Sequence, residues 1–274
     1  LRLEALGLDT PADRSLLSGL RARAGSRSEA LESIEQALAE DPTQSKDWLS
    51  YANLLHQEGE MSKALDAADK CLELDRQNGG AWALSATILA PKQNRLKEAL
   101  KAAVHAVALD AGGVDLILLK ADLLLAEGSA TAAEESLTKA LEKDMMNGEL
   151  RARIATRHLL DGRPDDAQKL LDETPVGIDH ALLHVVEGRL HLVNADKQRD
   201  GTGETDATLL SVAISAFEGA LKLNRELGVA WLGMARTNRL LRNLDAAEEA
   251  LTRARRLLPE DDSSAAAEAA LLAL

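Results

Sequence analysis

The sequence predicts an all-α protein made of about seven tandem helix pairs, and three observations support this fold class. Alanine and leucine, two of the stronger helix formers, supply 48 and 52 of the 274 residues. The chain has only three Trp, one Tyr and one Phe, whereas β-sheets are enriched in aromatic and β-branched residues. Finally, an alanine recurs about every 34 residues, which is a period typical of helical repeat proteins.

The recurring alanines set the boundaries of the predicted repeats. They are spaced by 34, 35, 34, 34, 46 and 34 residues, and the set is Ala30, Ala64, Ala99, Ala133, Ala167, Ala213 and Ala247. A second small residue follows most of them two helical turns later, on the same helix face, which lets two antiparallel helices approach closely. The predicted repeats are 11–44, 45–78, 79–113, 114–147, 148–180, 181–227 and 228–261.

Each repeat contains two helical patterns separated by a breaker. In the second repeat, Trp48, Tyr51 and Leu55 recur at helical spacing and form one face of its first helix. Gly59 then ends this helix, because glycine readily adopts the left-handed conformation found at helix C-termini. The second helix follows, with Cys71 on its inner face as a small apolar residue rather than a reactive thiol.

Two repeats and both chain ends depart from this pattern. The second helix of the fifth repeat is expected to stop early at Thr174-Pro175. The sixth repeat has about 12 extra residues, and 195–208 are predicted to form a mobile loop because this polar run buries too little surface to offset its ordering entropy. Residues 1–10 are interpreted as the end of a preceding helix, and 262–274 as a capping helix or a truncated eighth repeat, so the chain is expected to be a segment of a larger protein.

The repeat pattern resembles the tetratricopeptide repeat (TPR) family over residues 11–261, nearly the whole chain. That family's motif spaces Trp, Leu, Gly, Tyr, Ala, Phe and Pro over 34 residues. Trp48, Trp82 and Trp231 match its first aromatic position, Gly188 its glycine, and Phe217 its second-helix aromatic. The resemblance implies a right-handed superhelix (solenoid) in which the first helices line a concave groove.

The predicted groove becomes apolar from the fourth repeat onward, with arginines interspersed. Its candidate partner-binding residues are Leu118, Leu125, Leu159, Leu160, Val185, Arg189, Leu192, Leu232, Arg236 and Arg239. An exposed apolar stripe of this length needs a cover, so we expect it to bind an amphipathic helix or an apolar peptide, with the arginines pairing a carboxylate. The alternative is that superhelical curvature or the inserted segment buries these residues in the core.

No catalytic, cofactor-binding or metal-binding site is predicted. The sequence has no phosphate-binding glycine loop, nucleophile motif or dinucleotide fingerprint, so the chain is not expected to be an enzyme. His180, His184, Glu187 and His191 lie on one stripe of a predicted helix at a spacing that suits metal ligands. However, His184 and His191 occupy aromatic positions of the repeat, which favours a packing role for them.

The charge and hydropathy of the chain limit the classes of partner that it is expected to bind. A net charge of −13 disfavours binding to nucleic acid or anionic membranes, and no stretch is apolar enough to span a bilayer, so a soluble protein is expected.

The leading hypothesis is a non-catalytic interaction scaffold for a partner protein or peptide. Its composition resembles that of repeats in bacterial envelope assembly, secretion and exopolysaccharide export proteins, and its compartment, periplasm or cytoplasm, stays open. The alternatives are a module that self-associates through its terminal helices and the regulatory domain of an enzyme encoded elsewhere in the protein.

Overall fold

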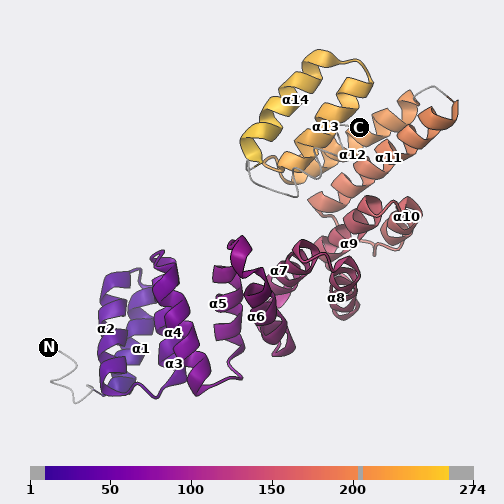
Figure 1. Ribbon diagram of the computed structural model, residues 1–274. Helices are drawn as coiled ribbons and strands as arrows, with labels where there is room; N and C mark the ends of the chain where they lie inside the picture. Colours follow the sequence, from indigo (N-terminus) through magenta and orange to yellow (C-terminus); the bar gives the residue numbers. More distant parts are fainter. Residues whose placement is uncertain (1–9, 203–205, 259–274) are drawn as a thin grey trace. The chain divides into compact units, whose positions relative to one another are not determined.

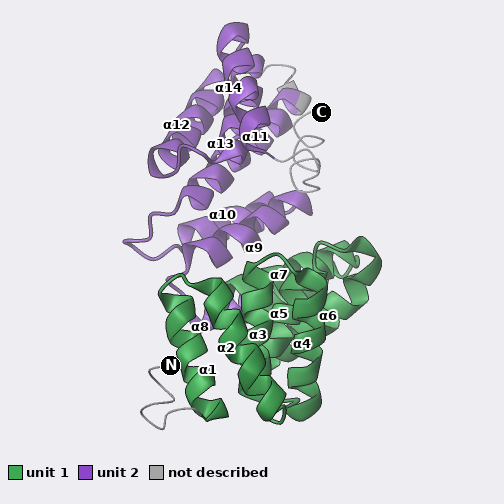
Figure 2. Cartoon of the chain, turned by 90° about the vertical axis from the view of Figure 1, so that its left-hand side faces the viewer, with its two compact units in different colours: residues 1–136 green, residues 137–274 purple. Residues whose placement is uncertain are grey.

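The fold is all-α, as predicted. The computed structural model describes residues 10–202 and 206–258, and every regular element in these ranges is a helix (Figure 1). The chain divides into two compact units, residues 1–136 and 137–274, which are called unit 1 and unit 2 below (Figure 2). The boundary between the two falls inside helix α8.

Most helices are 11 to 14 residues long, and three in unit 2 depart from this range. The helices that lie within unit 1 are α1 (Pro11–Arg23), α2 (Arg27–Glu40), α3 (Ser45–Gln57), α4 (Met61–Leu74), α5 (Gly79–Leu89), the short 3-10 helix η2 (Gln93–Arg95), α6 (Leu96–Ala108) and α7 (Gly113–Ala126). Helix α8 (Ala130–Lys143) contains the boundary. The helices of unit 2 are α9 (Gly148–Leu160), α10 (Pro164–Asp172), α11 (Ala181–Thr202), α12 (Ala207–Leu223), α13 (Gly228–Leu240) and α14 (Leu244–Leu257).

Successive helices pack on one another within each unit. In unit 1 each helix from α1 to α7 contacts the next, and in unit 2 the same holds from α9 to α14. The first helices of neighbouring pairs also touch, as α9 touches α11 and α11 touches α13. Six of the seven alanines that set the repeat period are buried, and five of them, Ala30, Ala64, Ala99, Ala167 and Ala213, have no exposed surface, whereas Ala247 is half-buried. A larger side chain at such a crossing would force the helices apart.

A recurrent hydrogen bond fixes the start of several first helices. The indole N–H of Trp48 donates to the carbonyl of Pro42 at 2.8 Å, and Trp82 and Trp231 donate in the same way to the carbonyl six residues upstream, each at 3.0 Å. Each tryptophan therefore ties the fourth residue of its helix to the turn that precedes it. In α9 the fourth residue is Arg151, whose Nη2 donates to the carbonyl of Met145, again six residues upstream, at 3.3 Å.

The prediction of a loop at 195–208 is wrong for the described part of that segment. Helix α11 continues through it to Thr202, and α12 begins at Ala207, where the side chain of Asp206 accepts from the N–H of Thr208 at 2.7 Å. The polar composition was misleading because the segment needs few apolar anchors. Extending an existing helix adds a hydrogen bond for each residue that is ordered, and Ala195 packs fully buried in the cluster that contains Leu210.

The expectations for the two chain ends fall largely outside the described residues. These were a helix end at 1–10 and a terminal helix or eighth repeat at 262–274. Thr10 is described, and it caps α1 by accepting from the N–H of Asp13 at 3.2 Å. Among the described helices, none combines the length and the apolarity needed to cross a lipid bilayer.

Candidate functional site

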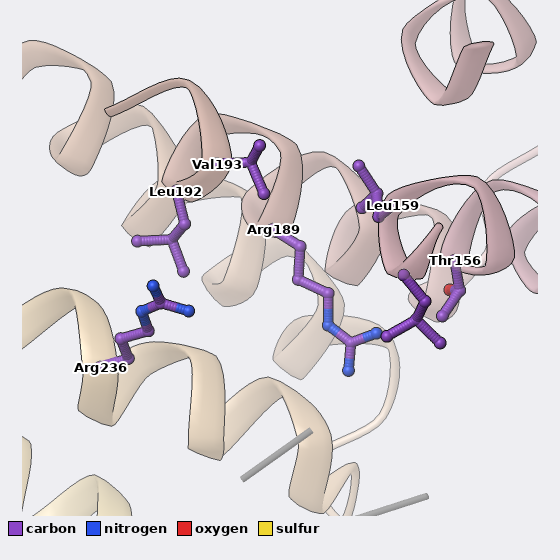
Figure 3. A pocket seen from close by; sticks show the side chains of 7 residues that line it. Thr156, Leu159, Arg189, Leu192, Val193 and Arg236 are labelled. Carbon is purple, nitrogen blue, oxygen red and sulfur yellow. The ribbon is translucent and has the colours of Figure 1, made fainter. Parts of the chain in front are cut away.

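A pocket lies within unit 2 where the first helices of three successive pairs run side by side. It is formed by α9, α11 and α13, and its open space is about 440 Å³ including the solvent at its mouth. On α9 and on α11 the lining residues lie three and four positions after the first one, so they project from one face of each helix, and α13 contributes a single residue. They are Thr156, Leu159, Leu160, Arg189, Leu192, Val193 and Arg236 (Figure 3).

The apolar part of the pocket comes from α9 and α11. Leu192 is only 1% exposed and forms the buried base of this wall, whereas Leu159 and Val193 are half-buried. Leu160 is 38% exposed at the end of α9. The wall therefore has a buried base and a solvent-exposed rim against which an apolar group of a ligand could pack. Removing apolar surface from water in this way stabilises a complex by about 25 cal/mol per Å².

The charged part of the pocket comes from α11 and α13. Figure 3 shows Arg236 projecting from α13 toward Leu192, while Arg189 extends from α11 toward the α9 side. Arg236 is 12% exposed, and its Nη2 lies 2.6 Å from Oδ2 of Asp196. Arg199 lies 3.5 Å from the other oxygen of the same carboxylate. Asp196, from the extended part of α11, therefore orients the guanidinium of Arg236 at the pocket.

The electrostatic environment of Arg236 is set by burial and by its neighbours. Burial lowers the pKa of Arg236, Asp196 opposes this change, and the positive charges of Arg239 and Arg199 lower the pKa further. A guanidinium remains protonated at any physiological pH. Arg236 therefore keeps its positive charge although its side chain is largely buried and two other arginines are near it. No carboxylate is among the residues that line the pocket. An anionic group is thus the charge that this lining suits.

The structure brings together half of the predicted groove residues. Leu159, Leu160, Arg189, Leu192 and Arg236 line the pocket. Leu232 on α13 is half-buried and Arg239 is exposed, and neither lines the pocket. Leu125 is half-buried on α7 in unit 1.

Three predicted groove residues are buried in the core, and this corrects the prediction: Leu192 forms only the base of the pocket and lies in the same core cluster as Val185, and Val185 and Leu118 do not line the pocket at all. Val185 is 2% exposed and packs in the cluster with Phe217, and Leu118 is 7% exposed. The alternative of core burial thus holds for these three side chains. The helical stripe used for the prediction is wide enough to include positions that face the adjacent helix as well as positions that face solvent, and sequence spacing alone does not separate them.

Val193 lies on the predicted stripe beside Leu192, whereas two other residues that shape the pocket were not predicted. Thr156 lies on the predicted stripe of α9 one turn before Leu159 and Leu160, so the spacing was sufficient to find it. Asp196 was missed because its segment was expected to be a loop, and the ion pair to Arg236 spans 40 residues of sequence. A contact of that separation leaves no signal in local periodicity.

The predicted histidine stripe lies elsewhere in unit 2. His180 precedes α11, and His184, Glu187 and His191 follow along it. Nε2 of His184 lies 2.8 Å from Oδ1 of Asp179, and its Nδ1 lies 3.6 Å from Oε2 of Glu187. Across the described ranges, no three His, Cys, Asp or Glu side chains converge as metal ligands do.

Comparisons with known proteins agree with the repeat architecture. Family models described as tetratricopeptide repeat match residues 48–78 and 124–176. Human IFIT1, in a dimer solved with m7Gppp-AAAA, is 19% identical with a TM-score of 0.53, covering 92% of this chain and 69% of that one. MamA from Desulfovibrio magneticus RS-1 is 17% identical with a TM-score of 0.53, covering 61% of this chain and 93% of that one. No curated protein matches the sequence significantly.

The helix pairs and the matches together define an α-helical repeat protein of the kind that serves as an interaction scaffold. More specifically, its repeats are of the tetratricopeptide type, as the two matched segments show.

Proposed function

We propose that this chain is a non-catalytic scaffold that binds a partner protein through the α9–α11–α13 pocket. The pocket would hold an apolar side chain of the partner next to a carboxylate, either a side chain or a chain terminus. The observation that carries this proposal is the composition of the lining, which consists of four aliphatic side chains, one hydroxyl and two guanidinium groups.

The apolar and charged parts of the pocket have separate roles in this proposal. Leu159, Leu160 and Val193 would supply affinity through the area that a partner covers. Arg189 and Arg236 would supply orientation, because a guanidinium recognises a carboxylate through two parallel hydrogen bonds. Asp196 holds one of these arginines in place before the partner arrives, and preorganisation of this kind reduces the ordering cost of binding.

A nucleic-acid ligand is the main competing proposal, since IFIT1 was solved with m7Gppp-AAAA. Arginines also bind phosphate. However, proteins that bind single-stranded RNA stack its bases on aromatic side chains, and no aromatic residue lines this pocket. The net charge of −13 would also repel a phosphate backbone. These two observations favour a peptide.

The proposal is tested by fluorescence anisotropy with the labelled peptide Ala-Ala-Glu-Leu carrying a free C-terminus. Leu160→Asp and Arg189→Ala should each weaken binding by about tenfold or more, which corresponds to about 1.4 kcal/mol. Leu244→Asp is the matched control, because Leu244 is 65% exposed on α14 and does not line the pocket. Leu192→Asp and Leu118→Asp would not be informative, since both leucines are buried and a charge there would unfold the protein.

Three outcomes would refute this function. The first is equal binding of the peptide by Leu160→Asp and the unmodified protein. The second is tight binding of a capped RNA oligonucleotide that is lost in the same variants, which would assign the pocket to nucleic acid. The third is light scattering that shows concentration-dependent oligomers dissociated by Leu160→Asp, which would make the pocket a self-association surface.

A further inference from the structure

A second pocket of unit 2 exists because helix α10 is short. Helix α10 has 9 residues, whereas the corresponding helices α2, α4 and α14 have 14. The chain leaves α10 at Glu173 and runs through Pro175 to His180, where α11 follows. The space that remains between the end of α10 and the first half of α11 is about 810 Å³ including solvent at its mouth. It is separate from the α9–α11–α13 pocket and shares no lining residue with it.

The shortened end of α10 is held in place by Arg151 of α9. The side chain of Arg151 is buried, and its Nη1 donates to the carbonyl of Leu170 at 3.1 Å. The hydroxyl of Thr174 donates to the same carbonyl at 3.3 Å. A cation at a helix C-terminus satisfies carbonyls that have lost their helical partners and interacts favourably with the helix dipole. The wall of the pocket is therefore a fixed structure.

The lining of this pocket combines an apolar floor with groups that accept hydrogen bonds. Four aliphatic side chains form the floor, namely Leu171, Ile178, Leu183 and Leu190. Carboxylates are supplied by Asp172 and Glu187, and imidazoles by His180, His184 and His191. Neither lysine nor arginine is among the lining residues.

The Nδ1 atoms of two histidines in this pocket differ in their hydrogen bonds. Nδ1 of His180 accepts from the N–H of Leu182 at 3.3 Å, which assigns the proton of a neutral ring to Nε2. Nδ1 of His191 is buried and has no hydrogen-bond partner among the described residues. A buried polar atom without a partner is costly, but this one has almost no accessible surface, so the exposed carboxylates of Asp172 and Glu187 are the groups that a ligand reaches first.

We propose that this pocket binds an alkyl cation, namely a guanidinium or ammonium group at the end of an aliphatic stem, as in an arginine or lysine side chain of a partner protein. The stem would cover the leucines of the floor, as the aliphatic parts of Arg and Lys do on protein surfaces. The charged end would lie between Asp172 and Glu187. A bare metal ion fits less well, because it has no use for an apolar floor and no ligand triad converges in the described part of the chain.

The probe for the proposal is the blocked peptide Ac-Ala-Arg-Ala-NH2, followed through the imidazole proton signals of the histidines in NMR. We expect saturable shifts of the His180, His184 and His191 signals. The variants Glu187→Gln and Asp172→Asn should each weaken binding by about fivefold or more, because a charge-assisted contact is lost. Glu248→Gln, an exposed carboxylate on α14, is the matched control and should leave binding unchanged. The side chain of Glu187 is 48% exposed, so its variant should keep the fold.

Three comparison ligands decide whether the charge is recognised and which kind of molecule supplies it. The norleucine peptide Ac-Ala-Nle-Ala-NH2 keeps the stem without the cation, and equal binding of this peptide would overturn the proposal. Zinc chloride that shifts the same histidines and blocks the arginine peptide at lower concentration would also overturn it. Spermidine that binds more tightly than the arginine peptide would support the cation site and assign it to free polyamines, and the reverse order would assign it to a partner protein.

Discussion

The packing of Phe217 allows a quantitative test of how unit 2 is held together. Phe217 on α12 has no exposed surface, and its ring lies between Gly188 of α11 and Gly233 of α13. A methyl group added at Gly188 would lie 2.7 Å from two ring carbons, and one added at Gly233 would lie 2.4 Å from two of them. Both separations are far shorter than the ~3.5–4 Å at which carbon atoms pack. The two glycines therefore form a slot for the ring.

Opposing effects set the size of the change when either glycine becomes alanine. Alanine in a helix interior stabilises it by about 1 kcal/mol relative to glycine, whereas overpacking of a buried site costs about 1–3 kcal/mol. The ring is rigid and enclosed, so the packing cost should exceed the helical gain at Gly233, where the contact is shorter. We expect Gly233→Ala to lower the free energy of unfolding by about 1–2 kcal/mol net, and Gly188→Ala by less.

The assay is thermal denaturation by circular dichroism, together with amide hydrogen exchange of α12. Hydrogen exchange is needed because repeat proteins can unfold in parts, and it reports local stability directly. Gly19→Ala is the matched control, since Gly19 lies inside α1 with no atom near the added methyl, and this change should be stabilising. The reasoning would be refuted if Gly233→Ala were as stable as the unmodified protein, or if Phe217→Leu failed to relieve the cost of Gly233→Ala.

Two further predictions concern buried polar groups. Arg151→Ala and Arg151→Trp should both speed hydrogen exchange in α10, because both remove the donor to the carbonyl of Leu170. Only Arg151→Trp keeps a donor to the carbonyl of Met145, as its counterparts do in α3, α5 and α13, so it should protect the start of α9 better than Arg151→Ala does. Unchanged exchange of α10 in both variants would show that the arginine has no anchoring role. Burial, and secondarily the charge of Asp75, raises the pKa of the Cys71 thiol to about 11. Alkylation by iodoacetamide at pH 8 should therefore be slow in the folded protein and rapid in denaturant, because the thiolate is the reactive form. Fast labelling of the folded chain would contradict this prediction.

The fold could be predicted because its signals are local and repeated. Alanine at a crossing, glycine in a turn and an aromatic at a fixed position each report on a helix or on the contact with its neighbour. Gly188 and Phe217 illustrate this, since both were assigned to positions of the repeat motif and the structure places them in contact. The same packing contacts recur in every repeat and require the same residue types at the same positions. Each repeat therefore indicates the fold independently of the others.

The candidate site could be predicted only in part, because exposure depends on what lies across from a helix. Leu192 and Leu160 share one periodicity but differ in exposed fraction, 1% against 38%, because Leu192 lies in the core cluster of α11, α12 and α13 whereas Leu160 is exposed at the end of α9. The ion pair of Asp196 and Arg236 could not be predicted either, because Asp196 lies on a helix in a segment whose composition favoured a loop. The sequence therefore predicted the helices that form the pocket more accurately than the side chains that line it.

The irregular features of unit 2 explain why its pockets occur where they do. A repeat that follows its motif closely buries its own surface against its neighbours and leaves little space. The shortened α10 removes a turn that would otherwise fill the space beside α11, and Arg151 stabilises the end that results. The lengthened α11 carries Asp196 to the side of Arg236 and so fixes a charge at the other pocket. Both changes meet on α11, so departures from the motif, rather than the motif itself, are where specificity should be sought in this chain.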